Sequence, residues 1–192
     1  MNSNEILGRI LFPGREIQKK VKELGNKITV DYKNRELVVI CILRGAVIFL
    51  TDLIRHIELP LSIDFMSISS YGFNMPDTGV VKITKDLDEN IEGKHVLIVE
   101  DIIDTGLTIS YLIRNLKARE PASIEICALI DRAVRRIAIF KIKYCAFKIE
   151  EKYVVGYGLD YKQKYRNLES IYELRTDTVK KDIESLKSAL NI

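Results

Sequence analysis

The feature that most constrains this chain is a series of short, continuously apolar runs separated by helical patterns. The runs are Leu37–Leu43, Leu61–Ile68, Val96–Val99, Ile124–Ile130 and Cys145–Ile149. Apolar residues on both faces of a strand indicate a sheet that is covered on both sides. Helical patterns lie between several of the runs, for example at residues 46–57 and 107–120. Strands that alternate with helices predict an open, mostly parallel α/β sheet flanked by helices.

Both ends of the chain add helical patterns to this sheet. After Pro13, apolar residues recur every three or four positions from Ile17 to Ile28, which predicts an amphipathic helix. The tail repeats this spacing, and a helix is expected at about 177–190, capped by Thr176 or Asp177. With 192 residues, 47% of them hydrophobic, and no linker rich in Pro, Gly or Ser, the chain is expected to form one domain over residues 1–192.

Composition excludes several classes of partner. Lys and Arg (30) nearly balance Asp and Glu (27), and a net charge of +3 is too small to indicate nucleic-acid binding. No apolar run approaches the length of a membrane span, so no membrane partner is expected. Cys41, Cys127 and Cys145 each lie in an apolar run without metal-binding spacing, which predicts buried, reduced thiols. These features and the absence of a leader pattern lead us to expect a cytoplasmic protein.

The segment HVLIVEDIIDTGLTIS, residues 95–110, carries the strongest functional signal. It is a buried strand that runs into Glu100 and Asp101 and then into Asp104, Thr-Gly and a helix. In open α/β sheets, ligands bind where strands end and helices begin, and free amides at a helix start suit a phosphate. Carboxylates are costly to bury without a cationic partner. Because neighbours on a strand point to opposite faces, Glu100 and Asp101 are expected to bind Mg²⁺ through water or substrate hydroxyls, not by joint chelation.

The residue pattern alone leaves a second interpretation open. Glu100 and Asp101 could be solvent-exposed turn residues, and Asp104 could be the N-cap of the following helix.

Residues 96–108, VLIVEDIIDTGLT, closely resemble the phosphoribosyl pyrophosphate signature of the type I phosphoribosyltransferases, in the hypoxanthine-guanine branch. The resemblance continues, in the family's order and spacing, through ILRGA (42–46), SSYG (69–72) and VVGYGLDYKQKYRNL (154–168). It implies a core at about 35–150 and a small hood built from the N-terminal segment and about residues 151–175. It also implies a homodimer or homotetramer that performs purine salvage, in which Mg²⁺ assists transfer of phosphoribose to a 6-oxopurine, hypoxanthine first and guanine next.

The resemblance assigns roles around the phosphoribosyl group. It implies that the residues from Thr105 through Gly106 and Leu107 to Thr108 cradle the 5′-phosphate. Glu100 and Asp101 would hold the ribose hydroxyls and the associated Mg²⁺. Asp104 resembles the family's general base, which exchanges a proton with purine N7 as the bond to N9 forms. A carboxylate beside a phosphate is repulsive, and a role in proton transfer explains its presence better than capping does.

The same resemblance assigns the leaving pyrophosphate to three places in the chain. Arg44 and Gly45 look like the pyrophosphate loop, where the family often uses a non-proline cis peptide. Ser70 and Tyr71 open a mobile loop that would close over the reacting centre and exclude water. Arg166 matches the family's distal pyrophosphate contact. Solvated surface charges remain the alternative for Arg44 and for Arg166.

The resemblance also implies how the purine is bound. Arg132 would contact O6, the ring of Tyr153 would stack on the base, and backbone groups of Val154 and Asp160 would contact its remaining edge. Asp160 is also expected to join Glu100 and Asp101 at the metal. Two positions depart from the common pattern, because Arg132 stands where Lys followed by Pro is common, and Tyr153 where Phe is common. The arginine side chain has hydrogen-bond donors but no acceptor, so it can bind a 6-oxo group but not a 6-amino group. The preference among hypoxanthine, guanine and xanthine stays open.

Two rival functions stay open at this point. One is a transferase that prefers guanine or xanthine, which Arg132 allows. The other is a regulatory protein that senses phosphoribosyl pyrophosphate and binds nucleic acid, since fold alone does not fix function. The second is disfavoured because the expected base and leaving-group residues are all present and the chain has no strongly basic stretch.

Overall fold

The computed structural model describes residues 6–70, 81–175 and 177. The chain forms two compact units, one made of Met1–Ile17 with Lys152–Ile192 and the other of Gln18–Glu151. The helix expected at about 177–190 lies outside the described residues apart from Asp177. Among the helices that the structure describes, none is long and apolar enough to cross a membrane.

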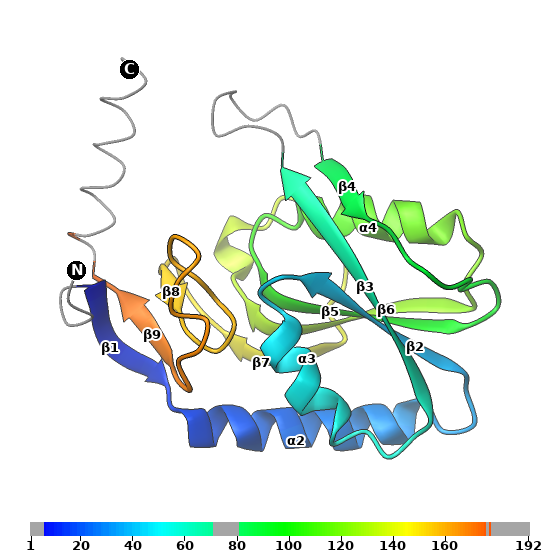
Figure 1. The fold of residues 1–192 in the computed structure, drawn as a ribbon, viewed down its shortest axis with the longest axis horizontal. Helices are drawn as coiled ribbons and strands as arrows, with labels where there is room; N and C mark the ends of the chain where they lie inside the picture. Colours follow the sequence, from blue (N-terminus) through cyan, green and yellow to red (C-terminus); the bar gives the residue numbers. More distant parts are fainter. Residues whose placement is uncertain (1–5, 71–80, 176, 178–192) are drawn as a thin grey trace. The chain divides into compact units, whose positions relative to one another are not determined.

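The larger unit contains a six-stranded sheet in the order β4-β3-β2-β5-β6-β7 (Figure 1). Its strands are β2 (Leu37–Leu43), β3 (Leu61–Ser70), β4 (Val81–Lys85), β5 (His95–Ile103), β6 (Ser123–Asp131) and β7 (Tyr144–Lys148). All neighbouring pairs are parallel except β3 and β4, which pair antiparallel at one edge. The predicted open, mostly parallel sheet is confirmed, whereas the antiparallel edge strand was not predicted.

The strand order changes direction at β2, and this positions the site. From β2 the chain crosses through α3 (Val47–Ile54) to β3 on one side, while β5 lies against the other side of β2. A crevice forms at the carboxyl ends of the strands where the order reverses, and ligands of open α/β proteins bind there. The residues that follow β2 and β5 therefore lie at the expected binding edge of this sheet.

Helices cover the sheet through apolar side chains. Helix α4 (Leu107–Lys117) buries Ile109, Leu112 and Leu116 in a cluster with alternate residues of β2, β5 and β6. The residues between them in β2 and β5 are also buried and point to the opposite face, because side chains alternate along a strand. Helix α2 (Gly14–Asp31) has the predicted buried stripe from Ile17 to Ile28, and its Gln18 side chain donates to Asp52 of α3 (2.6 Å).

The thiols depart in one respect from the expectation that all three are buried. Cys41 and Cys127 are buried, but Cys145 is only half-buried, because β7 is the edge strand of the sheet. Burial and the negative charges of Glu100 and Asp101 raise the pKa of Cys41 to about 12. The thiol of Cys41 is therefore protonated at neutral pH and chemically inert.

The smaller unit contains a three-stranded antiparallel sheet in the order β1-β9-β8. These strands are β1 (Leu7–Phe12), β9 (Ile171–Leu174) and β8 (Val154–Val155). Ile6, Val155 and Leu174 form its buried cluster. Among the described strands the first pairs with the last, so this sheet joins segments that are far apart in the sequence, as in the pairing of Leu7 with Leu174.

Candidate active site

Strand β5 carries Glu100 and Asp101 inside the sheet, not in a turn. The strand was expected to end at Val99, but its pairing with β6 continues to Ile103, opposite Asp131. Glu100 is 8% exposed. Burial, and then the charge of Asp101, raise the pKa of the Glu100 carboxyl well above its usual range. The interpretation of Glu100 as an exposed turn residue is therefore wrong, and its burial is the kind that a bound cation or ribose hydroxyls would offset.

The segment after β2 approaches β5 very closely. The peptide bond between Leu43 and Arg44 is cis. Gly45 follows it, and a Cβ added at Gly45 would overlap the Asp101 carboxylate and lie 2.6 Å from its Cγ. The other carboxylate oxygen, Oδ1, accepts a hydrogen bond from the Ile102 amide (2.7 Å). The structure thus brings the expected pyrophosphate loop against one of the two expected ribose and metal carboxylates.

Asp104 lies just beyond β5 and faces two arginines. Its Oδ2 is 3.3 Å from Nη1 of Arg132 and 3.2 Å from Nη1 of Arg135. Its Oδ1 is buried and has no hydrogen-bond partner among the residues that the structure describes. Such an oxygen has lone pairs free to accept a proton or a hydrogen bond from a ligand. Arg132 follows the end of β6 and is itself 7% exposed, so two neighbouring strands bring the expected base and the expected O6 contact together.

The turn from β5 to α4 has the form of an anion site. Gly106 is the N-cap of α4, in the left-handed conformation with φ +80°, and no side chain caps the helix there. The alternative that Asp104 is the N-cap is therefore wrong. Leu107 is the first helical residue, and its amide lies 3.5 Å from the Thr105 hydroxyl. A helix start with uncapped amides attracts a phosphate through the amides and the helix dipole.

Two functional candidates near Asp104 were missed by sequence reasoning. Arg135 contacts the Asp104 carboxylate, and Arg136 donates from Nε to the Asp104 carbonyl oxygen (3.0 Å). Arg136 also forms an ion pair with Asp131. The sequence signal that could have found them is the cluster DRAVRR at the end of an apolar run, which places three arginines where a parallel strand ends.

The smaller unit holds the remaining purine and pyrophosphate candidates. Val154 is buried in β8, whereas Tyr153 just before it is 48% exposed. Arg166 donates to the carbonyl oxygen of Gly158 (2.8 Å) and forms an ion pair with Asp160 (2.7 Å). Asp160 also accepts a hydrogen bond from the Gln163 amide (2.8 Å). Arg166 therefore stabilises its own loop, and it is not merely a solvated surface charge.

The expected mobile loop and the expected third metal carboxylate belong to other parts of the chain. Ser70 is the last residue of β3, and Tyr71 with the rest of the expected mobile loop lies outside the described residues. Asp160 belongs to the smaller unit, while Glu100 and Asp101 belong to the larger one. In the described part of the chain, no group of three or more His, Cys, Asp or Glu side chains is arranged to hold a metal ion.

Comparison with known proteins identifies the class to which this site belongs. Residues 10–162 match the family model of the phosphoribosyl transferase domain, and the chain belongs to this family. It is similar to the hypoxanthine-guanine-xanthine phosphoribosyltransferase of Tritrichomonas foetus, with 47% identity over 84% of this chain and 88% of that protein. It is similar to the hypoxanthine phosphoribosyltransferase of Salmonella typhimurium, with 47% identity over 83% of this chain and 90% of that protein.

Solved structures agree with this assignment. A crystal structure of a hypoxanthine phosphoribosyltransferase from Staphylococcus aureus superposes with a TM-score of 0.86 and 45% identity, covering 93% of this chain and 99% of that one. The relatives thus lie in the hypoxanthine-guanine branch of the family, as the resemblance of residues 96–108 predicted, and the predicted fold class is confirmed.

Proposed function

We propose that this chain transfers the 5-phosphoribosyl group of phosphoribosyl pyrophosphate to hypoxanthine, and also to guanine, releasing IMP or GMP and pyrophosphate. The observation that carries this proposal is the pair formed by Asp104 and Arg132, 3.3 Å apart beside the uncapped start of α4. The pair presents an acceptor next to a donor. On a 6-oxopurine, N7 and the O6 acceptor are adjacent on one edge, whereas adenine has a 6-amino donor beside N7. The pair therefore fits the edge of a 6-oxopurine whose N7 carries a proton.

The chemistry of the described residues follows from this pairing. As the bond from C1′ to the pyrophosphate oxygen breaks, the sugar becomes oxocarbenium-like, and N9 of the purine attacks C1′. The proton on N7 then passes to the Asp104 carboxylate, whose Oδ1 has no other hydrogen-bond partner among the described residues. Residues 105–108 hold the 5′-phosphate at the start of α4, which fixes the position of C1′.

Magnesium fits the donor set at the end of β5. Glu100 is a buried carboxylate with a raised pKa, and Asp101 lies next to it, so a divalent cation and ribose hydroxyls would stabilise their charged forms. Glu100 and Asp101 would hold Mg²⁺, with substrate oxygens and water as further ligands, and the expected role of Asp160 at the metal stays a prediction. When bound, the ion would neutralise charge on the departing pyrophosphate.

The other expected roles remain part of this proposal. Arg44 and Gly45, Ser70 with Tyr71, and Arg166 would serve the pyrophosphate. Tyr153 would stack on the purine, and the backbone near Val154 and Asp160 would contact its remaining edge. The close approach of Gly45 to Asp101 supports the first of these roles, because it joins the pyrophosphate loop to the ribose side of the site.

A panel of bases tests the proposed function. With Mg²⁺ and phosphoribosyl pyrophosphate, we expect turnover of hypoxanthine and guanine, and a kcat/KM for adenine lower by about a thousandfold or more. The physical reason is that the 6-amino group of adenine would place a donor against the donors of Arg132, and polar mismatches of this kind cost about 10⁴-fold where a site is built for hydrogen bonding. Steady-state kinetics with hypoxanthine, guanine, xanthine and adenine in parallel provide the measurement.

The same panel separates the rivals. Turnover of xanthine or guanine far above that of hypoxanthine would replace the proposed base preference. Absence of turnover with every base would overturn the enzyme function and favour the sensing protein, which would then show salt-dependent nucleic-acid affinity. The named relatives are transferases, so the sensing function is not favoured.

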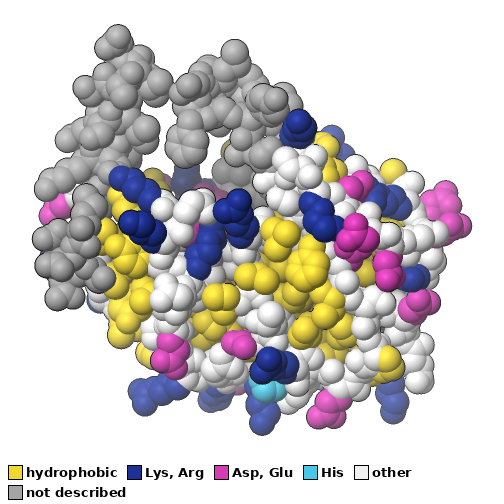
Figure 2. Space-filling model, viewed as in Figure 1, with side chains coloured by type: hydrophobic (Ala, Val, Ile, Leu, Met, Phe, Trp, Pro, Cys, Tyr) yellow, Lys and Arg dark blue, Asp and Glu magenta, His cyan; other side chains and the backbone are white. Residues whose placement is uncertain are grey.

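We also propose that the chain assembles with copies of itself through β3. Ile63 is 40% exposed and Phe65 is half-buried, and both point away from the face on which Met66 joins the α4 cluster. Figure 2 shows hydrophobic side chains gathered over β3 on the face in view. A contiguous exposed apolar surface of this kind is typical of a protein interface, and a second copy of the chain would cover it. A cytoplasmic location belongs to the proposal too, supported by three free cysteines among the described residues.

Replacing Ile63 by aspartate tests this assembly. The parent chain is expected to behave as a dimer or tetramer in light scattering coupled to gel filtration. Ile63→Asp should dissociate at concentrations at least about thirtyfold higher, because an unpaired carboxylate in an apolar interface costs several kcal/mol. Val30→Asp is the matched control, since Val30 of α2 is 74% exposed and lies outside β3. A monomeric parent, or equal dissociation of both variants, would contradict the proposal.

A further inference from the structure

Three consecutive carbonyl groups of the phosphate loop, defined here as residues 103–108, are held by the segment that follows β6. The Ile103 carbonyl oxygen accepts from the amide of Arg132 (2.9 Å). The Thr105 carbonyl oxygen accepts from the amides of Ile137 (2.9 Å) and Ala138 (3.1 Å). The Asp104 carbonyl oxygen between them accepts from a side chain, Nε of Arg136 (3.0 Å). One segment thus fixes three successive peptide planes.

These contacts determine where the loop amides point. In a planar trans peptide the carbonyl and the N–H of the next residue point in opposite directions. The carbonyls of residues 103, 104 and 105 face the segment after β6, so the amides of residues 104, 105 and 106 face away from it. Within the described part of the chain, none of these three amides donates to an acceptor. Successive free amides that point the same way form a concave anion site.

Arg136 is itself held from several sides. Its guanidinium forms an ion pair with Asp131 and lies 4.7 Å from the ring centroid of Phe140. Nη2 also lies 3.5 Å from the Ile103 carbonyl oxygen. The side chain is 17% exposed. Phe140 in turn packs against the loop, since a Cβ added at Gly106 would lie 2.5 Å from its Cε1.

We propose that Arg136 is a positioning residue that aims the amides of the phosphate loop at the 5′-phosphate of the substrate. It lies on the carbonyl side of the loop and orients the peptide between Asp104 and Thr105 without touching the phosphate. This inference rests on the proposed function, which places a phosphate ester at this loop.

The geometry of the guanidinium makes arginine necessary at this position. Nε donates a hydrogen bond to the Asp104 carbonyl oxygen, Nη2 forms the ion pair with Asp131, and the guanidinium lies over the ring of Phe140. A lysine ammonium is a single point and cannot bridge the carbonyl and the carboxylate in the same fixed plane. In Arg136→Lys the Asp104 carbonyl would therefore lose its fixed direction, and the Thr105 amide with it.

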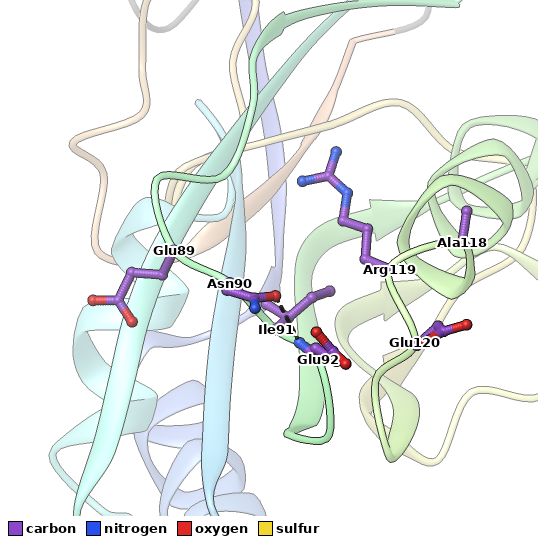
Figure 3. Close-up of a pocket in the computed structure, with 7 residues that line it drawn as sticks. All are labelled: Glu89, Asn90, Ile91, Glu92, Ala118, Arg119 and Glu120. Atoms are coloured by element: carbon purple, nitrogen blue, oxygen red, sulfur yellow. Dashed lines mark hydrogen bonds between the residues drawn. The ribbon is translucent and has the colours of Figure 1, made fainter.

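Arg119 provides a matched control. Like Arg136, it pairs with an aspartate, because its Nη2 lies 2.7 Å from Asp86, and it is also mostly buried (28% exposed). It lines a separate cavity of about 270 Å³ with Glu89, Glu92 and Glu120 (Figure 3). It follows the C-terminal end of α4, whereas the phosphate loop precedes the N-terminal end.

The test compares Arg136→Lys with Arg119→Lys. Calorimetry with ribose 5-phosphate gives the affinity for a phosphate ester without any turnover, and steady-state kinetics give the KM for phosphoribosyl pyrophosphate and for hypoxanthine. We expect Arg136→Lys to weaken ribose 5-phosphate binding and to raise the KM for phosphoribosyl pyrophosphate, each about tenfold or more. The KM for hypoxanthine should change less than about twofold, and Arg119→Lys should leave all three constants within about twofold.

A purely structural role for Arg136 predicts a different result. Both variants would then lose thermal stability and neither would change its phosphate affinity, which would overturn the proposal. If Arg136→Lys does not fold, Asp131→Asn loosens the same guanidinium while keeping the volume of its partner, and should weaken ribose 5-phosphate binding about threefold. Unchanged affinity in Asp131→Asn would also overturn the proposal. A parent chain that binds ribose 5-phosphate but turns over no base would disprove the proposed function. The role of Arg136 would still be tested by the ribose 5-phosphate affinities of the variants.

Discussion

Asp104→Asn is expected to lower kcat for hypoxanthine about a hundredfold or more, with a much smaller change in the KM for phosphoribosyl pyrophosphate. Asparagine keeps the size of the side chain and can still accept a hydrogen bond, but it cannot take the N7 proton. General base catalysis by one positioned group contributes about 10²-fold to 10⁴-fold. The proposed phosphate contacts of residues 105–108 would use backbone amides, which the substitution leaves unchanged.

The surroundings of Asp104 sharpen this prediction. Arg132 and Arg135 lie 3.3 and 3.2 Å from one carboxylate oxygen, so the negative charge is held in place by two cations. In Asp104→Asn both cations lose their counter-charge, and Arg132 becomes less well placed for O6. We therefore expect the KM for hypoxanthine to change as well, while the main loss stays in kcat.

Two further measurements distinguish a base from a merely structural carboxylate. Because the same group must return the proton in the reverse direction, pyrophosphorolysis of IMP should fall by a similar factor. Asp88→Asn is the control, since Asp88 is 78% exposed and pairs with Lys85 at the surface, and its kcat should stay within about twofold of the parent. A kcat for Asp104→Asn within about threefold of the parent would show that another group accepts the proton.

The parts of the fold that sequence predicted are those in which local pattern and burial coincide. The apolar run Leu37–Leu43 became β2 with the same bounds, and the stripe from Ile17 to Ile28 became the buried side of α2. β4 was not predicted because it is a five-residue edge strand with two lysines, too short and too polar to show a strand pattern of apolar residues. The β1-β9-β8 sheet depends on pairing between the two ends of the chain, which no local pattern encodes.

The residues of the candidate site fall into the same two groups: those that a local sequence pattern reveals and those that depend on contacts between distant segments. Glu100, Asp101 and Asp104 stand out in sequence because acidic residues interrupt an apolar strand before a helix. The roles of Arg135 and Arg136 do not stand out, because Asp104, which both contact, lies 31 and 32 residues earlier and meets them only once β5 and β6 pair. The dense arginine cluster was visible, but its target depends on which strand lies next to β6.

Gly45 is the second position where a small change should have a large effect. Gly45→Ala is expected to lower kcat/KM for phosphoribosyl pyrophosphate about a hundredfold. The added Cβ would overlap the Asp101 carboxylate, which cannot simply turn aside because its Oδ1 is held by the Ile102 amide (2.7 Å). Either the carboxylate or the segment after β2 must move, and a shift of about 1 Å in groups that position a substrate can cost about 10²-fold in rate.

Gly93→Ala is the control for this substitution. Unlike Gly45, Gly93 has a backbone conformation that disfavours a side chain, with φ +70°, but an added Cβ would meet nothing within 4 Å. Its replacement should reduce the free energy of unfolding by about 1 kcal/mol through backbone strain and leave activity unchanged.

A double-mutant cycle with Asp101→Ala tests the cause of the Gly45 effect. If overlap with the Asp101 carboxylate is the reason, removing that carboxylate should abolish the further cost of alanine at position 45, so that Asp101→Ala and the double variant have nearly equal kcat/KM. Independent losses that multiply in the double variant would mean that Gly45 is needed for its own backbone contacts with the pyrophosphate. The cycle thus distinguishes a glycine that makes room for a neighbouring carboxylate from a glycine that meets the substrate itself.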